Sequence, residues 1–149
     1  MRAKRLAIVH VYMPAERIAM LHKDYLEEAL KKFVSSITLP LTRAWKEGDL
    51  SLLGDVDGAI GELLNLSPGV VQTLAPQSLV TMMELSGIGA DVSHEIAFVL
   101  RKEALLYDRC DADDACCDAL DKAEAIEHAF NCDGTQPPYR FHALNDALN

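Results

Sequence analysis

The stretch that decides the fold is AERIAMLHKDYLEEALKKFVSSITL, residues 15–39. Its apolar side chains recur every three or four residues, which is the spacing of one face of an α-helix. Charged residues fill the other face, and Glu27–Lys31 and Glu28–Lys32 are acid–base pairs four residues apart, an arrangement that stabilises helices. The sequence therefore predicts one long amphipathic helix, whose apolar face consists of Ile18, Leu21, His22, Tyr25, Leu26, Ala29, Leu30, Phe33, Val34 and Ile37.

Pro40 follows this stretch directly. A proline has no backbone N–H to donate to the helix, and its ring disfavours the helical conformation of the residue before it. We therefore expect the helix to end or kink near Leu39, and beyond a kink residues 41–45 would continue it. Residues 46–49, Lys-Glu-Gly-Asp, have the composition of a helix exit and a loop.

Capping and breaking residues divide the rest of the chain into shorter helices. A serine before Pro68 and a proline at position 76 are typical of helix starts, and Gly87 and Gly89 are typical of a helix end. The predicted helices cover residues 55–64, 67–74, 76 to about 86, Asp91 or Ser93 to about 107, 111–130 and 139–148.

These patterns predict an all-α fold of about six helices, with no strand signal outside residues 6–12. We expect a weakly ordered N-terminal extension over residues 1–14, a single helical domain over residues 15–130, and a C-terminal tail with a short helix over residues 131–149. With 149 residues, half of them hydrophobic, the chain can bury roughly 70% of the surface that it exposes when unfolded.

The charge of the protein is unevenly distributed. The net charge is −9, of which residues 1–50 contribute +3 and residues 51–149 contribute −12. A protein that binds nucleic acid needs a basic face, and anionic membrane surfaces repel acidic proteins, so we expect neither as a partner. The apolar run at residues 6–13 is not followed by a small-residue cleavage site, and no stretch approaches the roughly 20 apolar residues of a membrane span. We expect a cytoplasmic protein.

The segment LLYDRCDADDA, residues 105–115, resembles the turn of a tetratricopeptide repeat, in which an aromatic-ended helix meets a helix with small residues on its inner face. The small residues here are Ala115, Ala119 and Ala123. Cys110 stands where that motif has glycine, and only one repeat is visible, whereas a solenoid needs about three. The resemblance therefore implies one antiparallel helical hairpin of repeat-like geometry.

A second resemblance covers residues 22–130. The leading Lys23-Asp24-Tyr25, the leucine-rich segment IGELLNLS at residues 60–67 and the closing hairpin resemble a family of small, uncharacterised, all-helical bacterial proteins. These motifs serve packing. The resemblance implies an all-helical fold and transfers no activity.

The cysteines and histidines give little indication of chemistry. The cysteines, at positions 110, 116, 117 and 132, lack the paired spacing of a zinc site, and we interpret them as reduced thiols. We expect no cofactor, and the sequence contains neither a phosphate-binding loop nor a nucleophilic serine elbow. The alternative hypothesis is a metal- or thiol-dependent protein, with ligands along one face of helix 111–130: Cys117, Asp121, Glu124 and His128.

The leading hypothesis is a non-enzymatic module that binds proteins, as a homodimer through its long first helix. Trp45 and the segment Tyr139-Arg140-Phe141 are interface candidates because Tyr, Arg and Trp are enriched in binding hot spots. That segment packs either on the protein's own core, which we favour, or on a neighbour. Asp114, Asp118 and Asp121 belong to an acidic run that would face outward and attract a basic partner.

Overall fold

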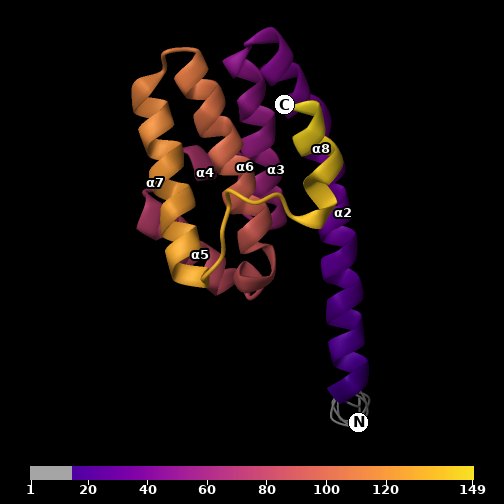
Figure 1. The fold of residues 1–149 in the computed structure, drawn as a ribbon. Helices are drawn as coiled ribbons and strands as arrows, with labels where there is room; N and C mark the ends of the chain where they lie inside the picture. The colour runs from indigo at the N-terminus through magenta and orange to yellow at the C-terminus, as the bar shows by residue number, and fades with distance from the viewer. Residues whose placement is uncertain (1–14) are drawn as a thin grey trace.

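The computed structural model describes residues 15–149, with side chains from Met20 onward (Figure 1). Over these residues the chain forms seven α-helices, two short 3-10 helices and no strand, which confirms the all-α prediction. The expected number was about six, and each of the seven helices overlaps a predicted range; the helices at residues 70–73 and 142–147 are very short. The predicted extension over residues 1–14, and with it the strand signal at residues 6–12, lies outside the described residues.

Helix α2 spans Ala15–Glu47 without interruption at Pro40. Of the two expectations for Pro40, an end of the helix at Leu39 is therefore wrong, whereas the expected continuation through residues 41–45 is observed. A proline inside a helix costs roughly 3 kcal/mol because one hydrogen bond is lost. Ile37 and Leu41, on either side of Pro40, are completely buried, and burying each such side chain stabilises by about 1.5–3 kcal/mol. Packing on both sides of the proline thus outweighs its cost.

The middle of the chain folds as a series of short helices. The 3-10 helix η1 (Leu50–Leu52) begins at Asp49, whose carboxylate accepts a 3.0 Å hydrogen bond from the Ser51 N–H. It leads into α3 (Leu53–Leu63), α4 (Val70–Thr73) and α5 (Pro76–Ser86). Pro76 opens α5 and Gly87, with φ +78°, ends it, as predicted. Gly89 instead becomes the first residue of the next helix.

Helices α6 (Gly89–Arg109) and α7 (Asp113–Phe130) form an antiparallel hairpin (Figure 1). Between them Asp111 adopts a left-handed conformation, with φ +59°, which reverses the chain. Ala119 and Ala123 of α7 are buried against α6, so the helices approach closely at small residues. The hairpin therefore exists as predicted, whereas its resemblance to a tetratricopeptide repeat stays a prediction.

The C-terminal segment returns to the first helix. The 3-10 helix η2 (Tyr139–Phe141) and α8 (His142–Ala147) lie beside α2 (Figure 1). Phe141, Leu144 and Leu148 are buried in the same core as α2, α3 and α6. None of the helices in residues 15–149 is long and apolar enough to cross a membrane.

Candidate functional site

The surface with the clearest potential to bind another molecule is one face of α2, which we call the outer stripe: Leu21, Tyr25, Glu28, Lys32 and Leu39. At 100° per residue these positions fall on one side of the helix, away from the side that enters the core. Its three large apolar side chains are exposed by 56%, 63% and 65%. Leu21 and Leu39 are about 27 Å apart along the helix axis.

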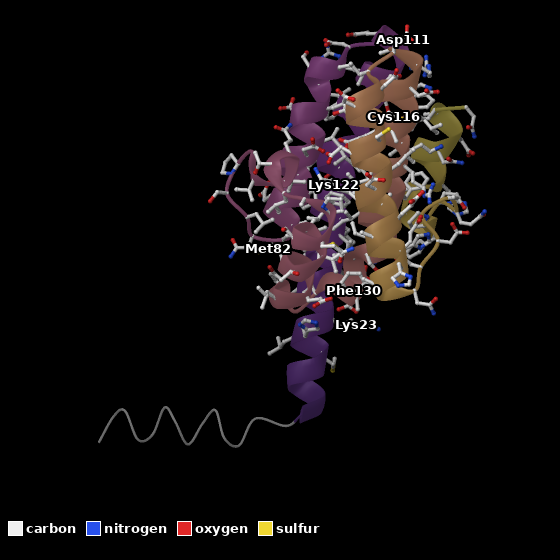
Figure 2. The ribbon with its side chains drawn as sticks, turned by 90° about the vertical axis from the view of Figure 1, so that its left-hand side faces the viewer. Lys23, Met82, Asp111, Cys116, Lys122 and Phe130 are labelled. Carbon is white, nitrogen blue, oxygen red and sulfur yellow. The ribbon has the colours of Figure 1, made fainter. Side chains whose placement is uncertain are left out.

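The N-terminal part of α2 projects beyond the other helices, and both views show this plainly (Figures 1 and 2). Lys23 lies on the projecting part, beyond Phe130 at the end of α7 (Figure 2). Leu21 and Tyr25 stand close to Lys23 in the sequence and are more than half exposed. An exposed helix end with large apolar side chains is typical of an interaction surface.

A groove of about 410 Å³ runs beside the outer stripe, between α2 and α3. Tyr25, Ala29 and Lys32 line it from α2, and Ala59 and Glu62 line it from α3. The Lys32 ammonium donates a 2.5 Å hydrogen bond to the Glu62 carboxylate across this groove, and that bond raises the pKa of Lys32. Both side chains remain mostly exposed, so this ion pair contributes little to stability.

The C-terminal segment packs against α2 and joins it to the core. The ring of Phe141 is completely buried and stacks on Phe98 of α6, with a centroid distance of 5.4 Å, while the edge of Phe33 of α2 meets it at 6.1 Å. Arg140 donates a 2.5 Å hydrogen bond to Glu27 of α2, which lowers the pKa of that carboxyl. Of the predicted interface segment, these two residues pack on the protein itself.

The other predicted aromatic candidates differ in exposure. Tyr139 is 72% exposed, with the Arg140 guanidinium 4.6 Å from its ring centre. Trp45 is half-buried at the opposite end of the molecule from the projecting part of α2 and is covered by Arg109, whose guanidinium lies 4.5 Å from the ring centre. Arg109 also donates a 3.4 Å hydrogen bond to the Trp45 carbonyl, so the indole has an internal partner.

The acidic residues of α7 do face outward. Asp114, Asp118 and Asp121 are exposed. The Asp118 carboxylate forms an ion pair with the Lys122 ammonium, with an N–O distance of 2.8 Å. The candidate metal ligands Cys117, Asp121, Glu124 and His128 are exposed on the same helix. Among the side chains that the structure describes, those of residues 20–149, no three of His, Cys, Asp or Glu lie close enough together to hold a metal ion.

The four cysteines form no disulfide. The surroundings of two of them disfavour the reactive thiolate form. Burial raises the pKa of the Cys116 thiol, and the nearby carboxylate of Asp108 raises it further. Burial also raises the pKa of Cys132. Because the thiolate is the reactive form, these shifts lower the reactivity of both residues at neutral pH.

A buried polar cluster between α3, α4, α6 and α7 was not predicted from the sequence. Asp57, Glu103 and Lys122 are 8%, 2% and 3% exposed. Burial, together with the charge of the nearby Asp57, raises the pKa of Glu103 well above its ordinary range. The Lys122 ammonium donates to the Val71 carbonyl at 3.1 Å and the Gln72 carbonyl at 3.5 Å.

The sequence contained a faint signal for this cluster. Asp57 stands between Val56 and Ala59 in an apolar helix, and Glu103 precedes Ala104 and Leu106 on the buried side of α6. Charged residues are almost never fully buried without a partner, so a single acid among apolar residues is ordinarily interpreted as lying at the boundary. Only the fold brings these residues, which are distant in sequence, to one point.

No family model, curated protein or solved structure matches this chain. The resemblance to small all-helical bacterial proteins therefore stays a prediction, like the resemblance to a tetratricopeptide repeat.

Proposed function

We propose that this protein is a non-enzymatic protein-binding module that self-associates through the outer stripe of α2. The observation that carries the proposal is the exposure of Leu21, Tyr25 and Leu39, each more than half exposed, on one side of a single helix. Apolar positions three, four and seven residues apart are the anchors by which one helix binds another. Burying them in an interface removes this surface from water.

A second copy of the chain is the partner that fits best, because the stripe is complementary to itself when two α2 helices lie antiparallel. With the two-fold axis at the level of Leu30, Leu21 of one copy lies opposite Leu39 of the other. Glu28 and Lys32 also lie at equal distances on either side of that axis, so each acid faces a base of the other copy. Leu21 thus meets Leu39, Tyr25 faces Ser35, and opposite charges meet twice.

The charged residues of the stripe are free to change partners. In the single chain Glu28 lies 3.7 Å from Lys31, and Lys32 pairs with Glu62, but all these side chains are at least 60% exposed. Exposed ion pairs are worth about 0–1 kcal/mol, so exchanging them for pairs across an interface costs little.

Sedimentation velocity and light scattering over a range of concentrations test the proposal. The wild-type protein is expected to form a dimer at micromolar concentrations, and Leu39→Glu is expected to be monomeric, because a symmetric interface contains the substitution twice. Met20→Glu is the matched control: Met20 is 64% exposed, but it lies about 140° around α2 from Tyr25. A strictly monomeric wild type, or equal effects of the two variants, would contradict the proposed interface.

A charge exchange tests the antiparallel register. Glu28→Lys alone and Lys32→Glu alone each place like charges opposite one another and are expected to weaken the dimer. The double variant restores both pairs and is expected to recover association. If the double variant is as weak as the sum of the single variants, the two residues do not face each other and the register is wrong.

A further inference from the structure

We propose that the cavity between α3, α4, α6 and α7 is a binding site for a small guanidinium compound, held by the carboxyl groups of Asp57 and Glu103. The cavity has a volume of about 230 Å³ and is lined by both carboxyl groups. One oxygen of each, Asp57 Oδ1 and Glu103 Oε1, is buried and has no hydrogen-bond partner in the protein. This inference is independent of self-association through α2.

Lys122 does not satisfy these two oxygens. Its ammonium has three N–H donors, and three other acceptors lie within reach: the Val71 carbonyl at 3.1 Å, the Gln72 carbonyl at 3.5 Å and the Asp118 carboxylate at 2.8 Å. Figure 2 shows Lys122 midway along α7, inside the bundle. The lysine therefore holds α4 against α7 and donates to neither carboxyl group.

A buried carboxyl oxygen without a donor is costly, and the cost is removed when an N–H group reaches it. A guanidinium group can supply these hydrogen bonds because it is planar and presents several N–H donors to two acceptors at once. It is also weakly hydrated, which suits a cavity whose walls include Leu100, Ala119 and the ring of Tyr107. The ring can stack on the guanidinium plane.

The cavity also has a route to solvent. Asp118 and Gln72 line it and are exposed, so they form its outer rim, while Asp57 and Glu103 lie at its inner end. A free guanidinium compound and an arginine side chain of a peptide share the chemistry that this site recognises. The two sources differ in the size of the rest of the molecule, which must remain outside the rim of the cavity.

Isothermal titration calorimetry with methylguanidinium chloride tests the proposal. Saturable binding with one site per chain is expected, and Glu103→Gln and Asp57→Asn are each expected to weaken it at least about tenfold, since each removes a carboxyl group that would pair with the bound cation. Asp121→Asn removes the same charge from the exposed face of α7 and is expected to bind like the wild type. N-acetylarginine amide distinguishes the sources: binding equal to methylguanidinium supports a peptide side chain, and weaker binding supports a free compound.

A second measurement on the unaltered protein avoids any dependence on the folding of the variants. The titratable groups that face Glu103 are Asp57 on α3, Tyr107 on α6, and Asp118 and Lys122 on α7, and α4 contributes no titratable side chain. A bound cation favours the ionised form of Glu103, so binding at neutral pH is expected to release a proton, seen as a dependence of the heat on the buffer.

Three results would overturn the site. Tetramethylammonium chloride has the same charge but no N–H donor, so equal binding of this ion would show that hydrogen bonding plays no part. A response that does not saturate, or equal affinity in Glu103→Gln and Asp121→Asn, would mean that the cavity holds water only.

Discussion

The buried ring of Phe141 joins the C-terminal segment to two distant helices, and its removal is expected to destabilise the whole protein. Phe141 is completely buried between Phe33 of α2 and Phe98 of α6. Truncating a buried phenylalanine to alanine costs about 3–5 kcal/mol, because the transfer energy of the ring is lost and a cavity remains. The two aromatic contacts account for about 0.5–1.5 kcal/mol each. We expect Phe141→Ala to lower the free energy of unfolding by about 4 kcal/mol.

Urea unfolding is the suitable assay, followed by circular dichroism and by the fluorescence of Trp45, the only tryptophan of the chain. The Phe141→Ala variant and the reference protein should both carry Leu39→Glu, so that association does not contribute to the measured stability. Tyr139→Ala is the control: this neighbouring aromatic side chain is 72% exposed, and its loss should cost less than about 1 kcal/mol. A cost below about 1 kcal/mol for Phe141→Ala would refute the placement of this ring in the core.

Two further predictions concern buried positions. Glu103→Gln is expected to raise stability at neutral pH by about 1–3 kcal/mol, because an amide can donate to Asp57 without carrying a charge. The pKa of Glu103 is raised from 4.5, so the folded protein holds this proton more tightly and loses stability as the pH rises above 4.5; urea unfolding over a pH series should show a weaker loss in the variant. Gly134→Ala is expected to cost about 1–3 kcal/mol in thermal unfolding, since its Cβ would lie 2.6 Å from Glu127 Oε2. Gly58→Ala has open space around it and should stabilise by about 0.5–1 kcal/mol, and equal effects of the two alanines would contradict this reasoning.

Among the sequence features, helix periodicity predicted the structure most reliably. The three- and four-residue spacing predicted the buried positions of α2, and Leu30, Phe33 and Ile37 are buried as expected. His22 and Tyr25 belong to the same apolar pattern but are exposed. Tyr25 falls on the outer stripe, and His22 is next to Lys23, which lies on the part of α2 that projects beyond the other helices (Figure 2). Periodicity indicates which face is apolar, but how far along the helix a neighbour extends depends on the tertiary structure.

Local rules failed where distant contacts were stronger. The rule for Pro40 is correct for an isolated helix and was overridden by the burial of Ile37 and Leu41. The buried cluster was missed for a related reason. Asp57 and Glu103 come from different helices, and nothing in the neighbouring sequence of either residue specifies the other.

The contact between Arg140 and Glu27 has a consequence for the order of folding. These residues are 113 positions apart in the chain, and Phe141 joins α2 to the core at the same place. During synthesis α2 leaves the ribosome early, but the side of it that Phe141 covers stays open until residue 141 has emerged. The hairpin of α6 and α7 is made of local contacts and can form before then. The C-terminal segment therefore closes upon α2 after the hairpin has formed, and until that step α2 retains exposed apolar surface that a chaperone can bind.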